Sequence, residues 1–184
     1  KAYNTSEANP VRILLVAPPY ALEEYPLPPL SLSYLSGSLL AHGFEVEILD
    51  LLTSKASAAK IRRKLEQYQP QLVGITSVTM TFPAAAKILK VCKEFHPSIT
   101  TVMGGQHASF AAEDAFHRAP WIDVVVAGEG EATVVELASA LDRGSDIGEV
   151  AGLYVNRNGK AIKTPTRRLI ENLAELPVPA RHLL

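Results

Sequence analysis

Short apolar runs alternate with segments of helical periodicity along most of the chain. The run 12–17 (RILLVA) is almost continuously apolar, as a strand buried on both faces of a sheet requires. The run 45–50 (EVEILD) alternates between apolar and polar positions, which is typical of a strand nearer the sheet edge. Further strands are predicted at 72–77, 99–103 and 123–127.

Helices are predicted after these strands, at 31–41, 57–68, 82–95, 109–117 and 132–141. Ser31 is suited to cap the first helix, and Gly43 is suited to end it. Pro83 falls in the first turn of the third helix, where proline is tolerated. The alternation predicts an α/β fold, a doubly wound parallel sheet of five strands in the flavodoxin-like order 2-1-3-4-5.

The pattern changes after Gly144. Residues 152–155 and 160–163 flank Asn158-Gly159, and Asn-Gly between two short strands predicts a β-hairpin. The remaining stretch has no clear period and contains several prolines. We therefore expect four parts, which are a disordered arm at 1–10, a Rossmann-like domain at 11–144, a hairpin extension at 145–168 and a linker at 169–184.

Composition narrows the class of protein. A net charge of -1 gives no electrostatic reason to expect binding to nucleic acid or to an anionic membrane. The apolar runs are strand-sized, and residues 1–10 lack the apolar stretch of a signal peptide. The single cysteine, Cys92, rules out an internal disulfide and a cysteine-ligated cluster built from this sequence, and it fits a reducing cytoplasm.

Two predicted strands end in glycine turns that open helices. Gly104-Gly105-Gln106-His107 follows one strand, and Gly128-Glu129-Gly130-Glu131 follows another. Glycine permits positive φ or the close approach of another group. Because ligands bind outside the carboxyl ends of the strands in an open parallel sheet, both turns predict a cofactor site at that edge.

The other two loops of this edge differ in character. The loop 18–31 is proline-rich and apolar; it would cover its own sheet edge, form an interface with another domain, or face a ligand. The loop 77–81 carries several hydroxyls, which would bind a ligand or cap the following helix. His107 would donate a hydrogen bond, bind a metal or cap its helix, and Glu131 would favour its own helix N-terminus.

Several functions are excluded by missing motifs. The first and third strands do not end in the aspartate of a phosphoacceptor domain, and the first loop lacks the glycine-rich turn of a phosphate-binding loop. No Gly-x-Ser-x-Gly turn is present. The histidines are scattered and there is no Cys-x-x-Cys, so no metal site is predicted.

Several segments together resemble the N-terminal cobalamin-binding domain of B12-dependent radical SAM enzymes, with methyltransferases and the anaerobic magnesium-protoporphyrin ester cyclase as the types most similar. The resemblance covers nearly the whole chain. The segments that carry it are 12–19, 27–35, 43–46, 73–77, 104–107, 123–131, the hairpin around Asn158-Gly159, and 176–181.

The resemblance implies where cobalamin would lie. The corrin ring would lie flat on the edge, facing loop 18–31, and its nucleotide tail would run down beside the sheet. We expect a bulky residue at Gly105 to weaken corrinoid binding with little loss of fold. The implied cofactor-binding residues are Pro19, Tyr20, Leu30, Ser31, Ser77, Val78, Thr79, Met80, Gly104, Gly105, Gln106, His107, Gly128, Glu129 and Gly130. No residue is expected to be catalytic.

Two motifs known from related proteins are absent from this sequence. Asp-x-His-x-x-Gly is missing, so the resemblance implies cobalamin without a histidine ligand from that motif. Cys-x-x-x-Cys-x-x-Cys is also missing, so the [4Fe-4S] cluster and S-adenosylmethionine would belong to a radical SAM domain that follows in the same polypeptide. We therefore expect a fragment that is not catalytic alone. The alternative is a stand-alone flavodoxin-like module that binds another small ligand or a protein partner.

Overall fold

The described residues form one seven-stranded sheet with helices on both faces. The structure, a computed structural model, describes residues 11–20, 27–52 and 56–184. The strands are β1 (Arg12–Ala17), β2 (Glu45–Asp50), β3 (Leu72–Thr76), β4 (Thr100–Gly104), β5 (Val124–Val126), β6 (Leu153–Arg157) and β7 (Lys160–Lys163). Their order in the sheet is β2-β1-β3-β4-β5-β6-β7, so the predicted order of the first five strands is confirmed.

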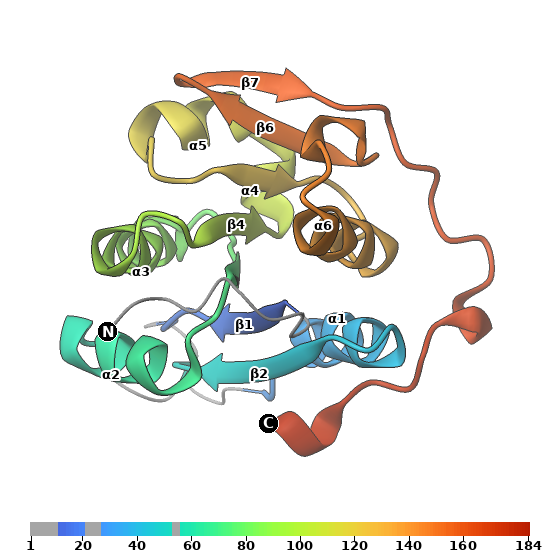
Figure 1. The fold of residues 1–184 in the computed structure, drawn as a ribbon, viewed down its shortest axis with the longest axis horizontal. Coiled ribbons are helices and arrows are strands. Elements are labelled where there is room, and N and C mark those ends of the chain that lie inside the picture. The colour runs from blue at the N-terminus through green and yellow to red at the C-terminus, as the bar shows by residue number, and fades with distance from the viewer. Residues whose placement is uncertain (1–10, 21–26, 53–55) are drawn as a thin grey trace.

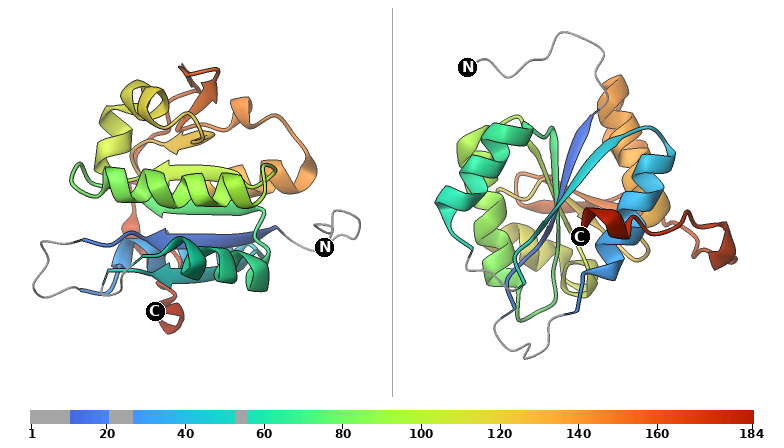
Figure 2. Two further views of the ribbon diagram at one scale, coloured as in Figure 1. Left: turned by 90° about the vertical axis from the view of Figure 1, so that its left-hand side faces the viewer. Right: turned by 90° about the horizontal axis from the view of Figure 1, so that it is seen from below.

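The helices form two layers (Figures 1 and 2). They are α1 (Leu30–Ala41), α2 (Ala58–Tyr68), α3 (Phe82–Phe95), α4 (Gln106–Phe110), α5 (Ala112–Arg118) and α6 (Glu131–Arg143). Helices α1 and α6 pack on one face of the sheet over Leu15 and Val102, whereas α2, α3 and α5 pack on the other face over Val73 and Val125. Both faces of the central strands are therefore buried, which explains their nearly continuous apolar sequence.

The C-terminal hairpin is part of the sheet. Strand β6 pairs antiparallel with β5, and β7 pairs antiparallel with β6. At the turn, Asn158 and Gly159 both have positive φ, and the Gly159 N–H donates to the Asn156 side-chain oxygen at 2.8 Å. The hairpin prediction is confirmed, but the sheet is mixed and larger than the predicted five strands because β5 leaves an edge that β6 covers.

Several helix boundaries differ from the prediction. Helix α1 begins at Leu30 after Pro29, so Ser31 lies in its first turn and is not the N-cap. The single helix predicted at 109–117 is two short helices, α4 and α5, which meet at Ala111. Gly43 ends α1 with φ of 84°, as predicted.

The segment after β7 runs back along the outside of α6 and α1 (Figure 1). The Ala180 N–H donates to the Ser33 carbonyl of α1 at 2.8 Å, and Ala180 itself is buried. At Gly37 the approach is so close that an added Cβ would stand 2.4 Å from the Val178 carbonyl oxygen. This segment, residues 164–184, is called the C-terminal strap below. The role of residues 169–184 as a linker stays a prediction.

Two findings concern membrane-spanning helices and metal sites. No helix among the described residues is long and apolar enough to cross a bilayer. Within the same described ranges, no group of three or more His, Cys, Asp or Glu side chains is placed to hold a metal ion. The predicted arm at 1–10 and part of the first loop, 21–26, lie outside the described residues.

Candidate functional site

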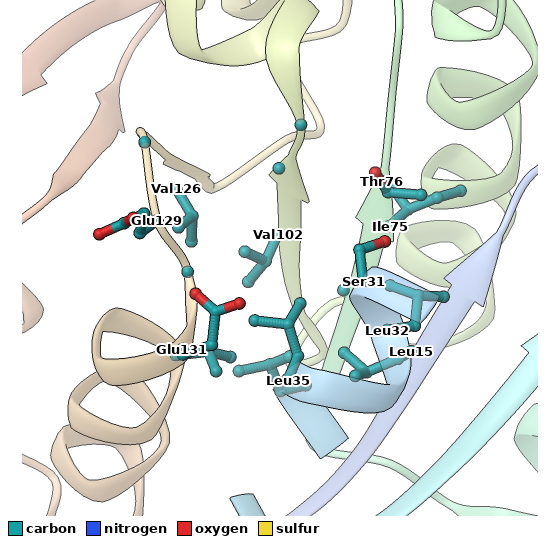
Figure 3. A pocket seen from close by; sticks show the side chains of 17 residues that line it. Leu15, Ser31, Leu32, Leu35, Ile75, Thr76, Val102, Val126, Glu129 and Glu131 are labelled. Carbon is teal, nitrogen blue, oxygen red and sulfur yellow. The ribbon is translucent and has the colours of Figure 1, made fainter. Parts of the chain in front are cut away.

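A cleft of about 230 Å³ opens between α1, α6 and the carboxyl ends of the central strands (Figure 3). Leu15, Gly74 and Val102 are register partners across β1, β3 and β4, and they form the deeper row of its floor. Thr76 and Gly104 are partners two positions further along and form the row nearer the edge. The cleft therefore lies where the predicted site was expected, beside the middle strands.

Glycines create the open floor. A Cβ added at Gly104 would meet no heavy atom within 4 Å outside its neighbours, so this position faces open space. A Cβ added at Gly74 would stand 2.9 Å from the Leu15 side chain, which covers that glycine. A glycine inside a strand commonly marks a close approach by another group. The structure thus leaves an open groove at Gly104 and a tightly packed floor below it.

The walls of the cleft are mainly aliphatic. Leu32 and Leu35 of α1, Val134 of α6 and Val126 of β5 line it. The polar lining residues all belong to the ends of elements at the carboxyl edge, and they are Ser31, Thr76, Glu129 and Glu131. The cleft therefore has an apolar interior and a polar mouth.

The two glutamates at the mouth have different surroundings. The Glu129 carboxylate accepts a hydrogen bond from the Ile170 N–H of the C-terminal strap at 2.6 Å, and it is turned away from the cleft (Figure 3). Glu131 is the first residue of α6, where a negative charge interacts favourably with the helix dipole. No side-chain cap bond forms there, because the N-cap residue is Gly130. The site is thus acidic at one end and connected to the strap.

Gly105 differs from Gly104 in its surroundings. It has φ of 92°, and a Cβ added there would lie 2.5 Å from the Ser77 carbonyl oxygen and 2.8 Å from the Ser77 nitrogen. The group that approaches Gly105 closely is therefore the protein's own loop 77–81 between β3 and α3, which is called the third loop below. The expectation that a bulky residue at Gly105 would leave the fold nearly intact is wrong, since such a residue would clash with backbone.

Hydroxyls of the third loop hold the loop together. The Ser77 hydroxyl is buried and donates to the Val78 carbonyl at 3.1 Å. The Thr81 hydroxyl accepts from the Val78 N–H at 3.0 Å and donates to the same carbonyl at 3.1 Å. Thr81 precedes α3 but makes no side-chain cap bond to it. The hydroxyl cluster thus shapes a rigid turn that leaves Val78 and Met80 exposed.

His107 lies beside this turn. Its Nδ1 is 3.3 Å from the Thr79 hydroxyl oxygen, and its ring packs on Phe82 with 4.6 Å between centroids. Its Nε2 is buried and has no hydrogen-bond partner among the described residues. His107, which is half-buried in α4, therefore connects this helix to the loop 77–81.

The first and third loops also meet. The Tyr20 hydroxyl donates to the Met80 sulfur at 3.8 Å. Of the implied cofactor-binding residues, Ser31, Gly104, Gly105, Gly128, Glu129 and Gly130 line the cleft. The others, Pro19, Tyr20, Leu30, Ser77, Val78, Thr79, Met80, Gln106 and His107, lie outside its lining, in or beside the loops at the carboxyl edge.

Residues of the cleft interior were missed by the sequence reasoning. It considered loops only, whereas strand and helix residues form most of the lining. The missed residues are Leu15, Leu32, Leu35, Leu72, Gly74, Ile75, Thr76, Val102, Val126 and Val134, whereas Glu131 was considered at its own helix N-terminus and was not counted among the cofactor-binding residues. Gly74 was the available signal, because a glycine inside a buried strand already indicates a close approach.

With this geometry in place, comparisons with known proteins define the class. A family model described as "B12 binding domain" matches residues 22–138. An uncharacterized methyltransferase of Pyrococcus horikoshii is 36% identical over 95% of this chain and 39% of its own length. The anaerobic magnesium-protoporphyrin IX monomethyl ester cyclase of Rubrivivax gelatinosus is 37% identical over 79% of this chain and 27% of its own. The chain thus spans well under half of each relative.

A solved structure is also similar to this chain. TsrM of Kitasatospora setae, a radical S-adenosylmethionine methyltransferase with cobalamin and a [4Fe-4S] cluster bound, superposes with a TM-score of 0.76 at 26% identity. The superposition covers 85% of this chain and 31% of TsrM. The chain belongs to the B12-binding domain family, as its sequence resemblance indicated.

Proposed function

We propose that this chain holds cobalamin with the corrin ring over the carboxyl edge of the sheet and the nucleotide tail in the cleft between α1 and α6. The open position at Gly104 carries the proposal, because it provides a groove in the sheet that the protein's own side chains do not fill. The residues present fit the group, since an apolar channel with a polar mouth suits a tail that is polar near the ring and aromatic at its end.

Individual residues contribute in different ways. Gly104 leaves room for the tail, and Val102 and Leu35 exclude water from it. Val78 and Met80, exposed on the rigid third loop, offer apolar surface to the ring from below. The absence of Asp-x-His-x-x-Gly supports a cobalamin that takes no histidine ligand from the first loop.

We infer that the domain serves a larger radical SAM enzyme. Bound cobalamin would supply methyl-transfer chemistry, which the Pyrococcus and Kitasatospora proteins support by their names. The Rubrivivax cyclase supports ring cyclisation as the second candidate reaction. In either case the [4Fe-4S] cluster and S-adenosylmethionine would be held by a radical SAM domain in the same polypeptide, and this chain would present the cofactor to it.

Binding of hydroxocobalamin by the purified chain tests the proposal. After incubation with excess cofactor and gel filtration, we expect a red protein peak whose visible spectrum is that of a corrinoid. A colourless protein peak would favour the alternative, a flavodoxin-like module for another ligand or a protein partner.

A further inference from the structure

The cleft is too small for a whole corrinoid and suits one arm of it. Its volume of about 230 Å³ lies below the roughly 300–1,000 Å³ of pockets that enclose a complete drug-sized ligand. Under the proposed function, the part of the cofactor that enters is the end of the tail, a bicyclic aromatic base. What lines the deep end of the cleft therefore decides which base is accepted.

The deep end offers no polar side chain to a base. Its floor row consists of Leu15, Gly74 and Val102, and the backbone of β1, β3 and β4 at these positions is in the parallel ladder. Leu15 and Val102 are 2% and 3% exposed, and Val134 of α6 is 4% exposed. The polar lining residues are confined to the mouth.

Such a surface discriminates between two kinds of base. A dimethylbenzimidazole presents methyl groups and one free ring nitrogen, whereas adenine presents an exocyclic amine and several ring nitrogens. Each polar atom that enters an aliphatic pocket loses its water without gaining a partner, which weakens binding. The penalty falls on adenine more heavily because more of its edge is polar.

We infer that the cleft is a selectivity site for the tail base, which takes a benzimidazole-type base and disfavours a purine. This inference rests on the proposed function, since it concerns the part of the cofactor that the cleft would hold. Beyond the proposed function, the inference states which corrinoids the protein prefers. It assigns this preference to the floor residues Leu15 and Val102, which lie in strands and not in the loops at the edge.

Three corrinoid probes test the inference on the purified chain, with dissociation constants read from visible absorption. They are cobalamin, the analogue that carries adenine in place of dimethylbenzimidazole, and cobinamide, which lacks the tail. We expect cobalamin to bind about tenfold or more tightly than the adenine analogue, which is within the range that a hydrophobic pocket achieves against a more polar isostere. Cobinamide is expected to bind no more tightly than the adenine analogue.

A hydroxyl placed in the floor should relax the selectivity. In Val102→Thr the new hydroxyl offers the adenine a partner, so we expect the ratio of the two dissociation constants to fall severalfold. Val73→Thr is the matched control, since Val73 is equally buried in a central strand but packs on the opposite face. Val126→Thr, at the side of the cleft, replaces Val102→Thr if thermal melting shows that the first variant is unfolded.

The outcomes separate the two proposals. Equal affinities for cobalamin and the adenine analogue, or an unchanged ratio in the folded cleft variant, would overturn the selectivity inference and leave the proposed function standing. Cobinamide that binds as tightly as cobalamin would also overturn it, because the tail would then contribute nothing. Failure of all three corrinoids to bind would overturn the proposed function itself.

Discussion

At the scale of single residues, two adjacent glycines show how different reasons can underlie the same residue type. Gly104 faces open space at the floor of the cleft. Gly105, with φ of 92°, lies against the Ser77 backbone. The first leaves open space in the cleft and the second serves the fold, and the sequence Gly-Gly does not distinguish them.

Filling the cleft should block the tail while preserving the fold. We expect Gly104→Val to weaken cobalamin binding by about tenfold or more, because the branched side chain would occupy space that the tail needs. Spectroscopic titration measures the affinity, and circular dichroism checks the fold. Ala161→Val, which adds similar bulk on β7, serves as the control and should bind normally. Unchanged affinity in Gly104→Val would contradict the proposed position of the tail.

Substitution of Gly105 should instead destabilise the protein. We expect Gly105→Ala to lower the free energy of unfolding by about 2 kcal/mol or more, because positive φ is strained for alanine and the Cβ would clash with Ser77. Gly43→Ala is the matched control, with φ of 84° but open space around the position, and it should lose only about 1 kcal/mol. Urea unfolding of both variants measures the difference; equal losses would show that the clash is relieved at no cost.

A buried thiol gives a further prediction. Cys92 belongs to α3, and burial of its side chain in the core raises the pKa of the thiol to about 12. The reactive thiolate is therefore scarce at neutral pH. We expect native protein to react with a thiol reagent far more slowly than protein unfolded in urea, where the thiol is exposed. Equal rates in the two states would mean that the core opens readily around α3.

At the scale of elements, the C-terminal strap joins the site to the outer helices. Its Ile170 N–H binds the Glu129 carboxylate, and its Arg167 forms an ion pair with Glu136 of α6. Arg167 also donates to the Ala151 carbonyl at 3.2 Å. The Glu129 contact therefore links a residue at the mouth of the cleft to the C-terminal strap.

Removal of the Glu129 carboxylate should release this part of the strap. A hydrogen bond to a charged acceptor contributes about 1.5–3 kcal/mol, so Glu129→Ala should speed amide exchange at Ile170 by roughly tenfold or more. Hydrogen exchange followed by NMR measures the rate. The Ala180 amide, which donates to the Ser33 carbonyl, should keep its rate and provides an internal control. Unchanged exchange at Ile170 would show that other contacts hold the strap.

At the scale of the whole molecule, one sheet carries two apolar cores. The core under α2, α3 and α5 and the core under α1 and α6 share the central strands, so each core packs on a sheet that the other also stabilises. The cleft is built into the second core. Ligand binding should therefore stabilise the entire domain and not only the loops around the site.

Thermal unfolding checks this coupling. With free hydroxocobalamin at a hundredfold its dissociation constant, linkage adds about 2.7 kcal/mol to stability. For a chain of 184 residues this corresponds to a rise in melting temperature of roughly 5–10 °C. Far-UV circular dichroism records the melting curve, and Gly104→Val should show little rise. A transition that splits into two steps on binding would show that the two cores unfold separately.

The sequence alone predicted the alternation of strands and helices, the hairpin turn and the family, because these depend on local periodicity, on Asn158-Gly159, and on short motifs and their order along the chain. The order of the first five strands was expected only as the common arrangement for such an alternation, and the folded sheet confirms it. The register between neighbouring strands, by contrast, is known only from the folded sheet. Only there do Leu15, Gly74 and Val102 become neighbours, although the chain separates them widely. The tertiary structure therefore decided that an aliphatic cleft lies beside the strands, that Gly105 serves the fold, and that the carboxylate of Glu129 holds the strap.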